Sequence, residues 1–310
     1  MSALITGSMA FDTIMVFQDQ FKNHILPDQV HILNVSFLVP EMRRNFGGCA
    51  GNIAYNLNLL GGEGLPMATV GADFAPYAAW MDMKGVSRVG IREIAEEFTA
   101  QAFITTDQDD NQITAFHPGA MNHAHLNKVS DHSGVSLGIV SPDGRQGMID
   151  HAQQFVDAGV PFMFDPGQGM PMFDGDDLNK FAEQATWLAF NDYEAKLMEE
   201  RTGKSMQQLA DQVKAVIVTR GGEGSYIYAN GECLDIPVVP VSELVDPTGC
   251  GDAYRGGLLY GLLNDLDWQT TGQIASLMGA FKMESQGPQN HSFTREEFDA
   301  RYKNVFGSSL

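Results

Sequence analysis

Short apolar runs alternate with amphipathic stretches along most of the chain. Four of the apolar runs predict buried strands, namely residues 135–140, 160–164, 186–190 and 215–218. Amphipathic stretches such as 146–158 and 193–201 lie between them and predict helices. This alternation is typical of an α/β fold in which helices cover both faces of a doubly wound, mostly parallel sheet. Ligands bind such a sheet beyond the carboxyl ends of its strands.

One early segment has a different pattern. Residues 31–39 alternate strictly, which predicts a strand whose two faces meet different surroundings. One face is largely apolar and consists of His31, Leu33, Val35, Phe37 and Val39. Because this face is too long for a flap that stands in water, we expect it to contact a second copy of the chain in a homodimer. The alternative is that it packs on the chain's own core.

A hairpin is expected between residues 97 and 118, where two strand-like runs flank a polar turn. If the turn pairs Asp107 with Gln112, then Phe103 faces Phe116 on one side of the ribbon. Neither this hairpin nor the earlier alternating segment belongs to a parallel core. We therefore expect one domain spanning residues 1–310, with a small β lid built from about residues 12–17, 30–39 and 97–118.

Composition narrows the functional classes. Apolar residues make up 44% of the chain and charged residues 19%, as in ordinary globular proteins. There is no apolar run long enough for a membrane span, and the first residues lack signal-peptide features. The three widely spaced cysteines suit neither a zinc site nor a disulfide framework, so we expect a cytoplasmic protein. The net charge of −20 disfavours nucleic acid or an anionic membrane as a partner.

The most informative motif is Asp246-Pro247-Thr248-Gly249-Cys250-Gly251-Asp252-Ala253, which follows a strand expected at 236–241 and precedes a helix. Gly249 and Gly251 let the backbone turn tightly. The N–H groups of Gly249, Cys250 and Gly251, with the helix dipole behind them, can then cradle a developing phosphoryl charge. Asp252 stands at the start of the helix, where its carboxylate can be an N-cap or a general base toward a hydroxyl group.

A second motif is Gly47-Gly48-Cys49-Ala50-Gly51-Asn52, which also leads into a helical pattern. Paired glycines let a ligand approach the main chain closely, and the Asn52 side chain offers both a donor and an acceptor. The motif lacks the Gly-Lys-Ser/Thr of a Walker loop and the spacing of a dinucleotide fingerprint. A dehydrogenase is therefore disfavoured.

Together the two motifs resemble the signatures of the ribokinase-like (PfkB) carbohydrate kinase family, and the resemblance covers nearly the whole chain. Within that family, several strings are similar to bacterial adenosine kinases of the actinobacterial type. They are residues 6–8, 36–39, 105–107, 116–121, 191–194 and 246–252. The resemblance implies a ribokinase-like fold and the transfer of the γ-phosphate of ATP to the 5′-hydroxyl of adenosine, a step of purine salvage.

The resemblance also assigns the acceptor site. Asp12 would hydrogen-bond the ribose 2′- and 3′-hydroxyls together with Gly48 and Asn52. Phe103 and Phe116 would hold the adenine ring by stacking. Three further residues would contact the base or the sugar: Ser8, Ser36 and Gln168. At the next position, where the adenosine kinases have a second Gln, this chain has Gly169.

On the nucleotide side, Asn191 and Glu194 match the family's Asn-x-x-Glu element, which helps to place Mg²⁺ through water. The expected loop under the ATP phosphates and ribose contains Thr219, Gly221, Gly222 and Gly224. Arg255 either reaches a phosphate or pairs with surface acids. The implied cofactors are ATP and Mg²⁺, with a monovalent cation such as K⁺ as a further candidate.

The implied mechanism is direct in-line transfer, with Asp252 as the base and the Gly249-Cys250-Gly251 amides holding the charge. Two alternatives stay open. One is a kinase of the same family that acts on inosine, guanosine, ribose or a hexose. The other is a non-catalytic nucleoside-binding protein that keeps the fold, against which the complete 246–252 motif argues.

Overall fold

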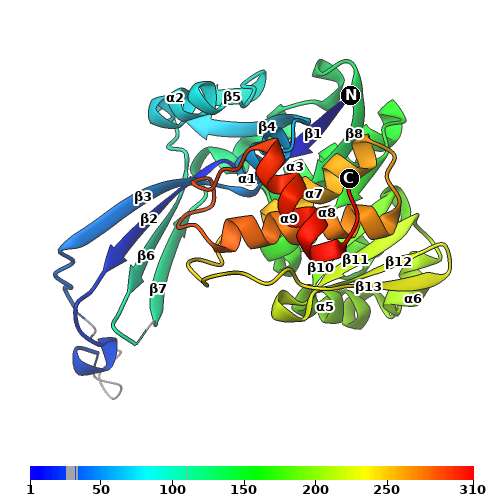
Figure 1. Ribbon diagram of the computed structural model, residues 1–310. Helices are drawn as coiled ribbons and strands as arrows, with labels where there is room; N and C mark the ends of the chain where they lie inside the picture. Colours follow the sequence, from blue (N-terminus) through cyan, green and yellow to red (C-terminus); the bar gives the residue numbers. More distant parts are fainter. Residues whose placement is uncertain (26–31, 33, 110) are drawn as a thin grey trace.

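The computed structural model describes residues 1–25, 32, 34–109 and 111–310 (Figure 1). Its body contains a nine-stranded sheet in the order β13-β12-β11-β10-β9-β8-β1-β4-β5. The strands are β1 (Ser2–Thr6), β4 (Glu63–Gly71), β5 (Gly90–Ile94), β8 (Val135–Val140), β9 (Phe162–Phe164), β10 (Trp187–Asn191), β11 (Ala215–Thr219), β12 (Ser225–Ala229) and β13 (Glu232–Ile236). The four runs predicted to be buried strands all form strands of this sheet.

The sheet is parallel from β5 to β11, and only β12 and β13 run antiparallel to their neighbours. From β1 the chain first moves outward to β4 and β5, and it then returns to place β8 on the other side of β1. The direction of strand addition therefore reverses between β1 and β8. Open α/β sheets bind their ligands beyond the carboxyl ends of the strands at such a point.

Helices cover both faces of the sheet, as the alternation predicts. One core packs α1 (Cys49–Leu59), α2 (Ala75–Lys84), α7 (Cys250–Leu263) and α8 (Trp268–Met283) on one face. A second core packs α3 (Arg145–Ala158), α4 (Gly175–Gln184), α5 (Asp192–Thr202) and α6 (Met206–Ala210) on the other. The last helix, α9 (Arg295–Phe306), packs against α8. In the described part of the chain, no helix is long and apolar enough to cross a membrane.

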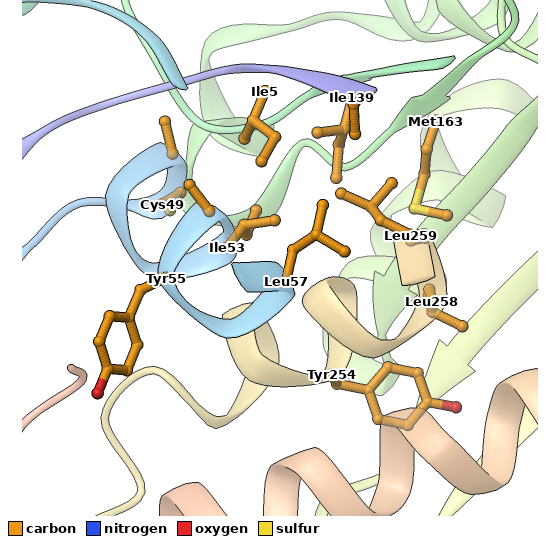
Figure 2. Close-up of a cluster of buried hydrophobic side chains, with 14 of the residues drawn as sticks. Ile5, Cys49, Ile53, Tyr55, Leu57, Ile139, Met163, Tyr254, Leu258 and Leu259 are labelled. Carbon is orange, nitrogen blue, oxygen red and sulfur yellow. The ribbon is translucent and has the colours of Figure 1, made fainter. Parts of the chain in front are cut away.

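Helices α1 and α7 carry the two glycine motifs and pack side by side. Figure 2 shows Leu57 of α1 and Leu259 of α7 beneath Ile139 of β8, all of them fully buried. The backbones approach closely because α7 has a glycine at the crossing. A Cβ on Gly256 would lie 2.7 Å from the Cβ of Asn56 on α1. This contact brings the N-termini of both helices to the same edge of the sheet.

A four-stranded sheet projects from the body as a lid (Figure 1). Its order is β3-β2-β6-β7, with strands β2 (Ala10–Val16), β3 (Glu41–Gly47), β6 (Ala100–Thr106) and β7 (Gln112–His117). The predicted hairpin is present, but its predicted register is wrong by one residue. Thr106 pairs with Gln112, and Phe116 therefore faces Ala102. Since a shift of one residue exchanges the faces of a strand, Phe103 and Phe116 lie on opposite faces of the lid.

Two other predictions about strands need correction. The described residues 34–39 form an extended loop, and the strand begins only at Glu41. The alternation there has another cause, because Phe37 packs its ring against Phe17 at 4.8 Å and Phe21 at 5.1 Å. His31 and Leu33 lie outside the described residues. The strand expected at 236–241 also fails, since β13 ends at Ile236 and a loop leads to α7.

Candidate active site

Most of the residues singled out in the sequence converge where the parallel strands end. Ser8 follows β1, Asp165 follows β9, and Asn191 and Thr219 are the last residues of β10 and β11. The α1 and α7 N-termini reach the same edge, because both helices pack on one face of the sheet. The first N–H groups of a helix have no partner within the helix, so some of them can bind a ligand there.

Asp252 lies in the first turn of α7, and its carboxylate is held by a residue of the other motif. Asn52 Nδ2 donates a hydrogen bond of 2.8 Å to Asp252 Oδ2. Burial raises the pKa of Asp252 to about 7, while the hydrogen bond from Asn52 acts in the opposite direction. A carboxylate with a pKa near neutrality takes up a proton more readily than an ordinary aspartate, as a general base requires.

The side chain of Gln289 orients the side chain of Asn52 through a hydrogen bond. Its Nε2 donates 2.9 Å to Asn52 Oδ1 and 2.6 Å to the hydroxyl oxygen of Tyr77. Its Oε1 accepts a hydrogen bond of 3.1 Å from Trp80 Nε1. These contacts leave Asn52 Nδ2 directed at Asp252. Sequence reasoning missed Gln289, because it lies 237 residues from Asn52 and outside any motif.

The turn before α7 has the tight geometry that the expected anion cradle requires. Gly249 has φ +82°, and a Cβ there would lie 2.8 Å from the Cβ of Pro288. The first helical bond joins Ala253 N to Gly249 O, so the amides of Gly251 and Asp252 are available to an anion. The Cys250 amide differs from the expectation, because it donates to Pro247 O at 3.1 Å and closes the turn.

The thiol of Cys250, the cysteine in this motif, is not an exposed nucleophile. Cys250 Sγ lies 3.7 Å from Gly279 O, and burial raises the pKa of its thiol to about 11. Cys49, in the other motif, is buried, and burial raises the pKa of its thiol further. Neither side chain is poised to form a thiolate. Any role of Cys250 in the reaction therefore belongs to its main chain.

Arg255 forms a buried ion pair one turn after Asp252. Its Nε and Nη2 donate to the two carboxylate oxygens of Asp165 at 3.1 and 2.9 Å, and both residues are buried. The pair is buried, whereas the sequence suggested a pair with surface acids. The negative charge of Asp165 contributes to the raised pKa of Asp252, and the positive charge of Arg255 opposes it.

Asp12 is the third residue of β2, in the lid sheet. A Cβ on Gly47 would come 2.4 Å from Asp12 Oδ2, so a larger residue there would displace this carboxylate. Burial, together with the charge of Asp246, raises the pKa of Asp12 to about 6. Gly48 has φ +86° and would carry a Cβ 2.5 Å from Ser8 O. The Ser8 hydroxyl oxygen accepts the amide of Cys49 at 3.2 Å, which fixes the start of α1.

The nucleotide-side residues lie at the ends of β10 and β11. Asn191 caps α5, and Glu194 reciprocates by accepting both the amide and the Nδ2 of Asn191 at 2.8 Å. Burial and the charge of Asp165 raise the pKa of Glu194. Thr219 Oγ1 donates to Phe190 O at 3.3 Å. The glycines that follow make an open turn: Gly221 has φ +54°, Gly222 has no neighbour within 4 Å of a Cβ, and Gly224 has φ +84°.

Four predicted substrate residues are exposed. Ser36 is exposed in the loop before β3, and Gln168 is exposed after β9. Phe116 is 52% exposed and shares its lid face with Asp12, since both pair in register with Ala102. Phe103 is 38% exposed and lies on the other face. The pairwise stacking of these two rings on one base is therefore not formed within a single chain.

Comparison with known proteins identifies the family. The model of the pfkB family carbohydrate kinases matches residues 9–295. The chain belongs to this family. It is an ATP-dependent kinase of the ribokinase-like fold.

Relatives of this kinase extend over nearly its whole length. It is 30% identical to a nucleoside kinase of Methanocaldococcus jannaschii over 261 residues, which cover 83% of this chain and 85% of the relative. It is 51% identical, with a TM-score of 0.91, to the Burkholderia thailandensis nucleoside kinase in complex with inosine, over 99% of this chain and 100% of the other. A second structure of that protein, in complex with ADP-inosine, has a TM-score of 0.88 and 54% identity over 99% and 97% of the two chains.

Proposed function

We propose that this kinase transfers the γ-phosphate of ATP to the 5′-hydroxyl of a purine nucleoside. The observation that carries the proposal is the 2.8 Å hydrogen bond between Asn52 and Asp252. It joins the motif expected to bind the ribose to the motif expected to supply the base. A hydroxyl on a sugar held by Asn52 would therefore lie within reach of Asp252. The relatives named as nucleoside kinases support the same substrate class.

The chemical step follows from this arrangement. Asp252 takes the proton of the 5′-hydroxyl while that oxygen forms a bond to the γ-phosphorus. The bond from the γ-phosphorus to the bridging oxygen breaks, and ADP leaves. The amides of Gly251 and Asp252, with the α7 dipole behind them, stabilise the charge on the transferred group. Positioning and electrostatics of this kind carry phosphoryl transfer without a covalent enzyme intermediate.

Magnesium fits the residues on the nucleotide side. Mg²⁺ prefers oxygen ligands and keeps several waters, so one carboxylate beside the phosphates suffices. Glu194 is held by Asn191 through both carboxylate oxygens, and a nearby cation would offset its burial and the charge of Asp165. When bound, Mg²⁺ neutralises charge on the ATP phosphates. Glu194 would orient its water shell.

Adenosine is the acceptor that the sequence resemblance favours, and inosine is the acceptor that the B. thailandensis complex favours. The residues expected around the base give little basis for strict selection. Gly169 is buried and offers no side-chain amide, while Gln168 and Phe116 are exposed. We therefore propose that the kinase accepts adenosine and also tolerates inosine.

An acceptor panel tests the proposal. ADP release from ATP is measured with adenosine, inosine, guanosine, ribose and fructose, using wild type and Asp252→Asn in parallel. We expect turnover with the purine nucleosides and a loss of about 10²–10⁴-fold in kcat for the variant. Turnover with ribose or fructose alone would refute the nucleoside assignment. A variant that keeps more than a tenth of the wild-type kcat would show that Asp252 is not the base.

We also propose a homodimer that forms through the lid. The face formed by His31, Leu33, Val35, Phe37 and Val39 no longer supports it, because Phe37 packs within its own chain. Support now comes from the lid face opposite Asp12, where Met42, Phe103 and Ile113 are 70%, 38% and 43% exposed. Exposed apolar side chains gathered on one sheet face are typical of an interface.

Sedimentation of wild type and of Phe103→Glu tests the dimer. We expect a wild-type dimer at micromolar concentration and a monomeric variant, because the introduced charge would be buried between two lids. Phe98→Glu is the matched control, since Phe98 is 62% exposed outside the lid strands. A monomeric wild type contradicts the proposal, and so does a Phe103→Glu variant that still dimerises.

A further inference from the structure

Lys282 is a fully buried lysine that the mechanism does not use. It lies in the last turn of α8, with none of its surface exposed. Its Nζ donates hydrogen bonds to two main-chain carbonyl oxygens, 2.8 Å to Asp246 O and 2.9 Å to Ser285 O. A buried lysine is rare unless its charge is compensated. The side chain therefore needs an explanation beyond packing.

The two carbonyls belong to the loops that build the active site. Asp246 opens the cradle motif, and its carboxylate accepts the amides of Thr248 and Gly287 at 2.8 Å. Ser285 begins the loop that continues to Pro288, which bounds the cradle at Gly249. The same loop contains Gln289, which holds Asn52. The amine of Lys282 thus connects the cradle to the residues that orient the base.

The two carbonyl acceptors of Lys282 Nζ resemble the ligands of a cation site. Carbonyl oxygens from separate loops are the ligands that replace the hydration shell of K⁺ in proteins. Burial lowers the pKa of Lys282, but the negative charge of Asp246 acts in the opposite direction. Two main-chain amides donate to the carboxylate of Asp246. Its negative charge therefore acts on the Lys282 ammonium without a direct ion pair. A single positive charge is thereby held between the loops by main-chain oxygens.

We propose that the Lys282 ammonium is a built-in monovalent cation and that this kinase needs no K⁺. The ammonium occupies the space between the carbonyls of Asp246 and Ser285, where an alkali cation would bind. The expectation of a K⁺ cofactor therefore does not fit the residues that are present. Lys282 acts as a positioning residue: it fixes the two loops and adds positive charge behind the anion cradle. This inference holds for any acceptor that the kinase phosphorylates.

The first test is an ion series on the wild-type kinase. ADP release is measured as KCl replaces tetramethylammonium chloride at constant ionic strength, so that screening does not change. We expect kcat to change by less than about twofold, because no site is left for the ion to fill. Activation by K⁺ of about tenfold or more would overturn the proposal, whichever acceptor is used.

The second test removes the ammonium group of Lys282 and so leaves the space between the two loops empty. Lys282→Ala should lose about 10–100-fold in kcat without K⁺, the range seen when a group that orients a site is removed. K⁺ or NH₄⁺ should restore activity, and K⁺ should raise the melting temperature of this variant but not of wild type. Lys282→Met keeps the stem and should respond to neither ion. Lys180→Ala, an exposed lysine on α4, is the control.

The thermal measurement separates this inference from the proposed function, because it needs no acceptor. An ion-dependent melting temperature in Lys282→Ala alone supports the inference even if the nucleoside assignment fails. A variant with wild-type kcat and no ion response would show that Lys282 only fills space. If Lys282→Ala does not fold, the wild-type ion series and Lys282→Met decide the question.

Discussion

The hydrogen bond from Asn52 to Asp252 allows a quantitative prediction of how the activity depends on pH. The pKa of Asp252 is about 7, and only the carboxylate can accept a proton. Activity is therefore present above pH 7 and falls as the pH drops through this value. Asn52→Leu removes the donor with little change in side-chain shape. Since Asn52 favours the charged form, its loss should raise the pKa of Asp252 further.

The size of the shift follows from the strength of the bond. A hydrogen bond to a charged group contributes about 1.5–3 kcal/mol, and one pKa unit corresponds to about 1.4 kcal/mol. The pKa of Asp252 should therefore rise by about one to two units in Asn52→Leu. At pH 7 the carboxylate fraction then falls from about a half to about 1–10%, and kcat/KM falls by about 5–50-fold from this cause alone.

The assay is kcat/KM for ADP release between pH 5.5 and 9.5, since this parameter reports the ionisation of the free enzyme. Loss of a ribose contact would lower the whole profile, whereas loss of the hydrogen bond moves its acid limb. Asn58→Leu is the control, because Asn58 lies on the same helix but bonds to Gly64 and Gly85. A variant profile that is lower but has an unmoved acid limb would refute the reasoning.

Three further substitutions test separate parts of the site. Asp12→Ala should raise KM for the nucleoside by about 10–100-fold through lost bonds to the ribose hydroxyls; equal use of adenosine and 2′-deoxyadenosine by wild type would contradict this role. Gly249→Ala should lower kcat by about 10²-fold, because the Cβ meets Pro288 and the cradle must move; wild-type kcat would show that the cradle tolerates the change. Arg255→Met should lower the free energy of unfolding by about 3–5 kcal/mol, because it leaves Asp165 buried without its partner. Urea denaturation measures this loss, Asp165→Leu added to the same chain should restore part of it, and an unchanged midpoint in the single variant would count against the buried pair.

Much of the fold could be predicted from the sequence because it depends on local patterns. Buried strands of a parallel sheet appear as short apolar runs, and amphipathic periodicity marks the helices between them. The two glycine motifs are equally local, since a tight turn into a helix needs glycine at fixed positions. Gly48 and Gly249 do have positive φ, as such turns require. The family and the two tight turns could therefore both be predicted from residues 47–52 and 246–252.

The lid has features that local sequence patterns do not determine. Alternation at 31–39 predicted a strand, but Phe37 joins a cluster with Phe17 and Phe21, which supplies the same periodicity. The hairpin was expected and exists, yet its register was wrong by one residue, and that error exchanges Phe103 between the two faces. Pairing depends on how the turn closes and on what each face meets. Neither is contained in the strand sequences alone.

Only the tertiary structure identified the residues that hold other residues of the site in position. Gln289 and Asn52 are 237 residues apart, Lys282 and Asp246 are 36 apart, and Arg255 and Asp165 are 90 apart. Each pair meets because helices α1, α7 and α8, which carry Asn52, Arg255 and Lys282, pack beside the loops that carry their partners. The physical reason is that a side chain's charge and hydrogen bonds depend on its neighbours in space, whereas sequence patterns report its neighbours along the chain. The sequence by itself determined which chemistry this protein carries, and the packing of α1 and α7 on one face of the sheet decided which groups control it.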